Sequence, residues 1–284
     1  MNPNKSIAEY TDYRKFLRDY YLDRKKTIRN FSYKIIAEGA GLSSASFVRM
    51  VIEGEKNLTK ESAAGFARAL RLKRKAAEYF QHIVFFSQAK DLRTKEQYLK
   101  KIDGFRRRNK PDLLLSKEYD YLRNWLHAVV REAVELPSFD GNPDKIAAGF
   151  VFRVSPDDIR KSIDFLLANG FLTRDDRGKL KKVAKTISTV DIPRNDELVL
   201  IAKKYHLRML ELAGKALLEL PKEERNVTNT TLSMSGKSYE LALKRIETMR
   251  YELLELAAAD DNGVDRVYQL NVNLFPLIKL KQAQ

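Results

Sequence analysis

Apolar residues recur at intervals of three and four along most of this chain, the spacing of one buried face of an α-helix. Within residues 1–90 the pattern and its interruptions predict a domain of five helices. Thr59 stands where a capping side chain is expected before the fourth of them, and Glu61 follows in its first turn, where the helix dipole favours an acid. The predicted helices cover residues 11–28, 31–39, 43–52, 60–70 and 74–90.

A polar and strongly basic stretch follows at residues 91–111, and it contains Gly104 and Pro111 as helix breakers. We predict a basic, partly helical linker there. Residues 112–192 then show two short helices followed by a hairpin, which is the order of elements in a winged helix. The expected elements are a helix at 114–136, short helices at 144–150 and 156–169, and strands at 171–174 and 179–183.

The last region, residues 193–284, alternates long amphipathic helices with segments of strand character. A helix is predicted from beyond Pro193 to about Leu220 and another over 236–259. Residues 227–234 are rich in β-branched side chains, and residues 267–277 alternate apolar and polar ones. We therefore expect two strands that pair. The fold class predicted is mainly α with minor β, and this last region is expected to dimerise or to sense a signal.

Positive charge is concentrated at the front of the chain. Residues 1–110 hold 26 Lys and Arg against 12 Asp and Glu, a net charge of +14, whereas residues 111–284 hold 27 against 26. Such an asymmetry is typical of a portion that binds a polyanion joined to a portion with another task. No signal peptide and no membrane-spanning stretch is visible, so we expect a cytoplasmic protein.

Residues 31–54 fit the pattern of a helix-turn-helix. Gly41 can adopt the positive φ that the turn needs, and Ala37 allows close contact between helices. Phe47, Val48 and Val51 give the second helix an apolar face. The opposite face would point to DNA, and the predicted contacts to base edges and phosphates are Ser43, Ser44, Ser46 and Arg49, with Lys34, Lys56 and Asn57 as flanking phosphate contacts.

The hairpin of the winged-helix-like unit is a second candidate for DNA contact. Its basic side chains would suit phosphates beside a groove. However, the helix before it opens with Asp157 and Asp158, which would repel DNA. The unit is therefore also compatible with dimerisation or protein contact. The possible wing contacts are Arg174, Arg177, Lys179, Lys181 and Lys182.

The sequence offers no pattern typical of an enzyme, a metal site or a cofactor site. There are no cysteines, and His82, His127 and His206 are far apart. Ser235-Gly236-Lys237-Ser238 resembles the end of a phosphate-binding loop, but Thr231 occupies the place of its first glycine. His127 lies on an amphipathic helix, and we interpret it as a core or hinge histidine. We expect no catalytic residue, no metal and no cofactor.

Several short motifs resemble an uncharacterised bacterial family of about this length. They include 10–17 (YTDYRKFL), 40–44 (AGLSS), Gly54 with 57–59 (NLT), 130–132 (VRE), 205–206 (YH), 224–225 (ER), 267–270 (VYQL) and 274–277 (LFPL). The resemblance covers nearly the whole chain. It implies a helix-turn-helix front, a conserved C-terminal region and a role in transcription regulation. Residues 31–54 are also similar to the repressor-type helix-turn-helix of phage regulators.

These observations lead to the hypothesis of a sequence-specific regulator that binds double-stranded DNA. A homodimer is expected, because one short recognition helix seldom gives enough specificity whereas two half-sites do. The alternative is an adaptor whose basic N-terminal domain docks on an acidic protein or on RNA.

Overall fold

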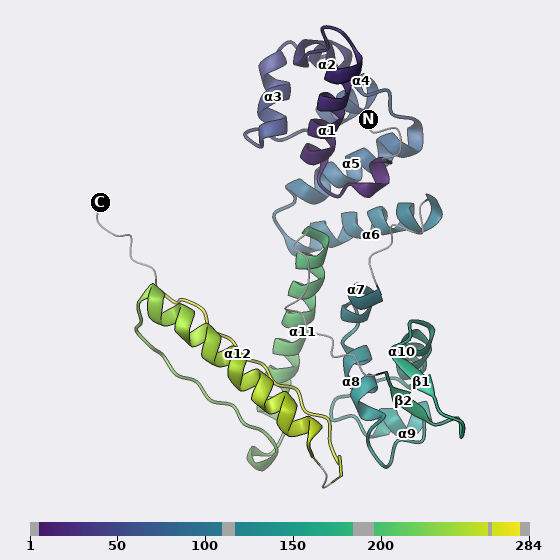
Figure 1. Ribbon diagram of the computed structural model, residues 1–284, viewed down its shortest axis with the longest axis vertical. Coiled ribbons are helices and arrows are strands. Elements are labelled where there is room, and N and C mark those ends of the chain that lie inside the picture. The colour runs from purple at the N-terminus through teal and green to yellow at the C-terminus, as the bar shows by residue number, and fades with distance from the viewer. Residues whose placement is uncertain (1–5, 110–116, 184–195, 261–262, 279–284) are drawn as a thin grey trace. The chain divides into compact units, whose positions relative to one another are not determined.

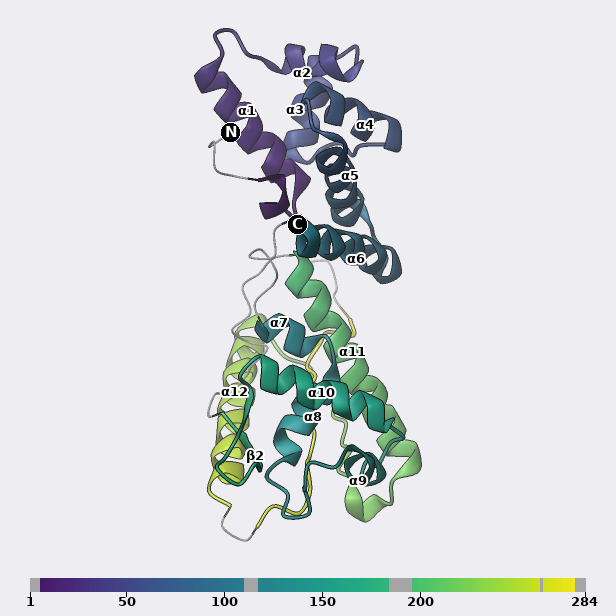
Figure 2. The ribbon, with the colours of Figure 1, turned by 90° about the vertical axis from the view of Figure 1, so that its right-hand side faces the viewer.

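The computed structural model describes residues 6–109, 117–183, 196–260 and 263–278. In these ranges the fold is mainly helical with one small two-stranded sheet, which confirms the predicted fold class. The chain divides into two units (Figures 1 and 2). Unit 1 comprises residues 1–119 and 188–203, and unit 2 comprises residues 120–187 and 204–284.

Unit 1 contains the five helices expected at the front of the chain, preceded by a 3-10 turn, η1 (Ile7–Glu9). Asp12 begins the first helix, since its carboxylate accepts hydrogen bonds from the backbone N–H groups of Arg14 and Lys15. Thr59 and Ser62 form a reciprocal capping pair at the start of the fourth. The helices are α1 (Tyr13–Thr27), α2 (Tyr33–Ala40), α3 (Ala45–Glu53), α4 (Lys60–Ala69) and α5 (Arg74–Gln88).

The stretch predicted as a linker is instead an ordered helix, α6 (Leu92–Asn109). Leu99 and Ile102 are buried one turn apart, so α6 belongs to the core of unit 1. Its basic composition concealed this narrow apolar face. Gly104 does not interrupt the helix, because a glycine inside a helix costs only about 1 kcal/mol relative to alanine.

Large aromatic side chains fill the core of unit 1. Tyr13, Phe16, Phe66, Tyr79 and Phe80 are fully buried. The hydroxyl group of Tyr79 donates to the carbonyl oxygens of Ala8 at 3.1 Å and Tyr10 at 2.8 Å. This pairing fixes η1 against α5 and satisfies a hydroxyl that would otherwise be costly to bury. Burial also raises the pKa of Tyr79, so the hydroxyl stays protonated.

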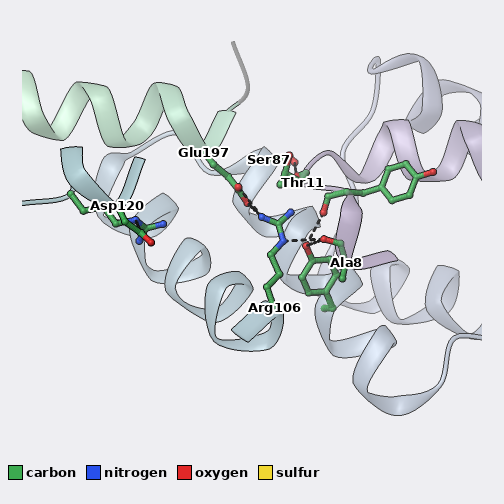
Figure 3. Close-up of polar contacts among 9 residues, drawn as sticks. Ala8, Thr11, Ser87, Arg106, Asp120 and Glu197 are labelled. Atoms are coloured by element: carbon green, nitrogen blue, oxygen red, sulfur yellow. Dashed lines mark hydrogen bonds and ion pairs between the residues drawn. The ribbon is translucent and has the colours of Figure 1, made fainter. Parts of the chain in front are cut away.

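A buried ion pair connects α6 to the first turn of α11 (Asp196–Glu219) within unit 1. The Arg106 guanidinium donates to both carboxylate oxygens of Glu197, at 3.0 and 2.9 Å, and through Nε to the Ala8 carbonyl at 2.9 Å (Figure 3). Both side chains are almost completely inaccessible, at 5% and 1% exposure. Residues 91 positions apart in the chain thus share one core contact.

Unit 2 begins with the helices and hairpin predicted for a winged-helix-like order. The single helix expected at 114–136 is two helices, α7 (Lys117–Leu122) and α8 (Trp125–Ala133). They are separate because the Asn124 side chain caps the N-terminus of α8 by accepting from the Leu126 N–H at 3.1 Å. The elements that follow are α9 (Pro143–Ala148), α10 (Pro156–Ala168), β1 (Leu172–Arg174) and β2 (Leu180–Lys182).

The two strands pair antiparallel, with Thr173 opposite Lys181. Asp175 shapes the turn between them: its carboxylate accepts from the backbone N–H groups of Arg177 at 3.0 Å and Lys179 at 2.9 Å. Gly178 follows with φ 78°, a conformation that favours glycine. The predicted hairpin is confirmed.

The predicted strands at 227–234 and 267–277 do not form. In both segments the chain belongs to no strand. The first segment precedes α12 (Gly236–Ala258) in the sequence, and the second follows it. The strand pattern is present in the sequence, but a strand exists only where a neighbour completes its hydrogen bonds. A further 3-10 turn, η3 (Lys222–Glu224), follows α11.

Candidate nucleic-acid interface

Helices α2 and α3 meet at an angle of 104° and are joined by residues 41–44. Gly41 ends α2 in the left-handed conformation, with φ 72°. The N–H groups of Gly41 and Leu42 donate to the carbonyl oxygens of Glu38 and Ala37, at 3.1 and 2.8 Å. This pairing is the usual way to end a helix at a glycine, and it fixes the direction in which the chain enters α3.

Helix α4 supports this corner by approaching α2 closely. A Cβ atom on Gly65 would lie 2.4 Å from the carbonyl oxygen of Ala40, which no side chain allows. Gly39 also lies close to α4, because a Cβ there would be 3.2 Å from Ala69. The glycine at position 65 therefore sets the distance between α4 and the last residue of α2.

The apolar face of α3 fixes which side chains face outward. Val48, Val51 and Ile52 are buried, while Ser43, Ser46 and Arg49 are exposed. Ser44 is half-buried, and its Oγ lies 2.6 Å from the Oγ of Ser46. The structure thus brings the four predicted contacts together at the start of α3: Ser43 and Ser44 lie in the turn before the helix, and Ser46 and Arg49 lie within it.

The N-terminus of α3 has no side-chain cap. Ser44 occupies the capping position, but its side chain accepts no hydrogen bond from the first turn. The backbone N–H groups of the first turn of a helix point outward and carry partial positive charge. Such an end is suited to a phosphate oxygen.

Arg49 forms an ion pair with Glu53, one turn further along α3. Both side chains are about half exposed, at 48% and 43%. Exposed pairs of this kind contribute at most about 1 kcal/mol, so Arg49 can exchange Glu53 for another acceptor at low cost. Lys34 is more exposed, at 77%, and its amino group lies 3.9 Å from the Glu38 carboxylate.

Two arginines of α1, which were not among the predicted site residues, hold the other end of α3. Arg14 donates through Nε to the Val51 carbonyl at 3.1 Å, and Arg18 donates to the Ile52 carbonyl at 3.3 Å. Cationic groups are favourable at a helix C-terminus. The only signal in the sequence was their spacing of four residues, which places them on one face of α1.

Arg14 also engages two residues predicted to contact phosphates. It donates to the side-chain oxygen of Asn57 at 2.7 Å and to the backbone carbonyl of Lys56 at 3.3 Å. The Asn57 side chain therefore fastens the segment after α3 to α1, while the Lys56 side chain is exposed.

In unit 2, the proposed wing contacts divide into two groups. Arg174, Arg177, Lys179 and Lys181 are exposed, although Lys181 lies 3.4 Å from Asp175. Lys182 is half-buried, and its amino group lies 2.7 Å from the Glu132 carboxylate of α8. At the start of α10, Asp157 pairs with Arg160 and Asp158 with Lys161, so these acids are partly neutralised within their own helix.

Comparison with known proteins adds a family to this geometry. A family model described as a domain of unknown function, DUF4423, matches residues 106–277, which is more than half of the chain. The chain belongs to the DUF4423 family. No curated protein and no solved structure matches it. The DUF4423 match begins near the end of α6, so helices α1–α5 lie outside it.

Within the DUF4423 region, His127 is a core histidine, as interpreted from its helix. Its ring stacks on Phe165 with 4.1 Å between centroids, and its Nδ1 lies 2.7 Å from the Ser162 hydroxyl. Burial lowers the pKa of His127 to about 4, because a charged imidazolium would lose its hydration. The side chain is thus neutral and structural at neutral pH.

Among the described residues, no group of three or more His, Asp or Glu side chains is placed to hold a metal ion. No single described helix is long and apolar enough to cross a membrane; α2 and α3 pass that test only when taken as a bent pair.

Proposed function

We propose that this DUF4423 protein is a sequence-specific, DNA-binding transcription regulator that acts in the cytoplasm as a homodimer. The observation that carries the proposal is the corner between α2 and α3. A crossing angle of 104° through a four-residue turn lies within the geometry of helix-turn-helix motifs, whose second helix enters the major groove of DNA.

The distribution of charge supports the same reading. Residues 1–110, which contain this corner, carry a net charge of +14, and the rest of the chain is nearly neutral. Neutralising phosphates is the main source of affinity for DNA, and it needs such a basic body. A pocket for an acidic small-molecule substrate would instead need only a few cationic side chains that converge on one point.

The exposed residues of α3 and of the turn before it take distinct roles in this proposal. Ser43, Ser46 and Arg49 would reach base edges, with Arg49 moving from Glu53 to a guanine. The uncapped first turn of α3, together with the side chains of Lys34 and Lys56, would contact phosphates. Asn57 would act through Arg14, by holding α3 in place.

The wing of unit 2 has weaker support as a DNA reader. Lys182 is engaged by Glu132, and α10 opens with acids, which disfavour insertion of its N-terminus into a groove. The proposal therefore assigns sequence reading to α3 and leaves the wing a secondary role at most.

The test is an electrophoretic shift titration of the full chain on genomic fragments at two salt concentrations. A regulator should bind a few fragments at least about a thousandfold more tightly than the rest. Replacing both residues in Ser46→Ala/Arg49→Ala should abolish this preference, while nonspecific binding and the circular dichroism spectrum stay close to those of the parent protein.

Arg74→Ala is the matched control, because Arg74 also lies in unit 1, is 92% exposed and pairs with a glutamate four residues on. It should weaken binding to all fragments alike and leave the preference intact. Equal binding to every fragment would refute the proposal. Preference that survives Ser46→Ala/Arg49→Ala but is lost in Arg174→Ala/Lys181→Ala would assign reading to the wing.

A further inference from the structure

Helix α12 is a long helix that buries none of its residues in a hydrophobic core. It spans 23 residues, none of which is buried. Only Ala242, Ile246 and Arg250 are partly covered, and the remaining positions are exposed. Soluble proteins rarely leave so continuous an apolar surface open unless it meets a partner.

The apolar residues of α12 follow the pattern of a coiled coil. Intervals of three and four alternate strictly through Tyr239, Ala242, Ile246, Met249, Leu253 and Leu256. This is a heptad repeat, whose two apolar positions form a seam that packs against another helix. Exposure along the seam reaches 38% at Met249, 42% at Leu253 and 69% at Leu256.

The extended segments on either side of α12 are apolar and exposed as well. Tyr268 and Leu270 are 75% and 51% exposed, and Leu232 is 61% exposed. Asn271 donates to the Met209 carbonyl of α11 at 3.0 Å, which ties the second segment to unit 2. Residues 226–260 and 263–278, here named the arm, thus combine one open helix with two extended segments (Figure 1).

Charge along α12 identifies the partner. Residues 236–246 contain three basic residues and one acidic residue, and residues 247–258 contain one basic and three acidic. This order opposes the helix dipole, which favours acids at the N-terminus and bases at the C-terminus. It is, however, complementary to a second α12 running in the opposite direction.

We propose that the arm is the dimerisation surface of this protein and that its occupant is the arm of a second copy, with the two α12 helices antiparallel. A twofold axis requires a self-complementary surface, and a helix with opposite charge in its two halves satisfies that requirement. Arg245 and Glu252 each precede a seam residue, so they flank the seam on the same side and pair between copies.

Nucleic acid is the less favourable occupant. The arm holds five Lys and Arg against six Asp and Glu, so phosphates would be repelled. The choice of a second copy as the partner rests on the proposed function, which includes a homodimer. The test below measures mass alone and needs no DNA.

Sedimentation velocity of the full chain should give a dimer of the 32.8 kDa protomer. Met249→Glu/Leu253→Glu should weaken dimerisation at least about a hundredfold, because two charges per copy would enter an apolar seam. Both side chains are exposed in the single chain, so the protomer should keep its circular dichroism spectrum. Leu241→Glu/Thr248→Glu is the matched control: it adds the same charge to α12 off the seam and should leave the dimer intact.

A charge exchange tests the direction of the helices. Arg245→Glu alone and Glu252→Arg alone should each weaken the dimer several-fold, and the double exchange should restore it. A monomeric parent protein, a dimer that survives Met249→Glu/Leu253→Glu, or a double exchange that stays weak would overturn the proposal. Equal binding of the parent protein to every DNA fragment would instead refute the proposed function. The dimer measured by sedimentation would be unaffected by that result.

Discussion

Single residues in this protein take roles that depend on their neighbours in space. Asn57 lies in a basic, polar segment, as a phosphate contact should, yet its side-chain oxygen accepts from Arg14 of α1. Arg106 belongs to a stretch rich in exposed cations, yet it is buried against Glu197. His127 matches its interpretation because its helix already carried a strong apolar pattern. The side-chain type alone could not separate these cases.

The pH dependence of unit 2 follows from His127. Because its pKa is lowered from 6.5 to about 4 in the fold, the unfolded chain binds the extra proton first as the pH falls. The free energy of unfolding should therefore decrease between pH 6.5 and pH 4, by at most about 3 kcal/mol. Urea titrations that follow Trp125 fluorescence at several pH values measure it.

His127→Gln should remove most of that decrease, since no imidazole remains to be protonated. His206→Gln is the control, because His206 is exposed and its replacement should leave the decrease unchanged. An unaltered pH dependence in His127→Gln would assign the effect to other groups.

Among elements, the contact of α2 with α4 decides the geometry of the candidate interface. Helices α2 and α4 lie so close together that a Cβ atom on Gly65 would clash with the backbone of α2. The helices themselves were predictable, since their caps and apolar spacing are local features. The distance between α2 and α4 was not predictable. The local sequence around a glycine in a helix does not show whether another helix packs closely against it or whether the glycine is merely tolerated there.

Gly65→Ala should destabilise unit 1 by about 1–3 kcal/mol, because the new Cβ would displace the backbone of α2. This outcome opposes the preference of helices for alanine, which would add about 1 kcal/mol of stability. Urea unfolding followed by far-UV circular dichroism gives the difference. Gly104→Ala in α6 is the control: its Cβ would meet only the Arg108 guanidinium, at 3.9 Å, so stability should be equal or higher. Stabilisation by both substitutions would contradict the contact.

For the whole molecule, the chain leaves unit 1 and returns to it. Residues 188–203 belong to unit 1, and they supply Glu197 to the core built by residues 6–109. The front domain predicted at residues 1–90 is thus completed by residues a hundred positions away. DNA-binding experiments should accordingly use the full chain, because a fragment ending at residue 110 would leave Arg106 buried without its carboxylate.

Glu197→Ala should lower the stability of unit 1 by about 3–5 kcal/mol, since it leaves a buried guanidinium unpaired. The double substitution Arg106→Met/Glu197→Leu should cost less than Glu197→Ala alone, because it removes both charges. Urea unfolding followed by circular dichroism reports the loss, and Trp125 fluorescence follows unit 2 separately. A double variant as unstable as the sum of its single variants would show that the charges do not act as a pair.

The sequence by itself determined the features that depend on nearby residues. These are most of the helix ranges, the cap at Thr59, the hairpin within residues 171–183, and the concentration of positive charge in residues 1–110. Only the tertiary structure decided the features that need a distant partner: α6 as a core helix, the hold of Arg14 on α3, and the absence of strands at 227–234 and 267–277. Spacing and capping act within a few residues, whereas burial, ion pairing and strand formation depend on which segments the fold brings together.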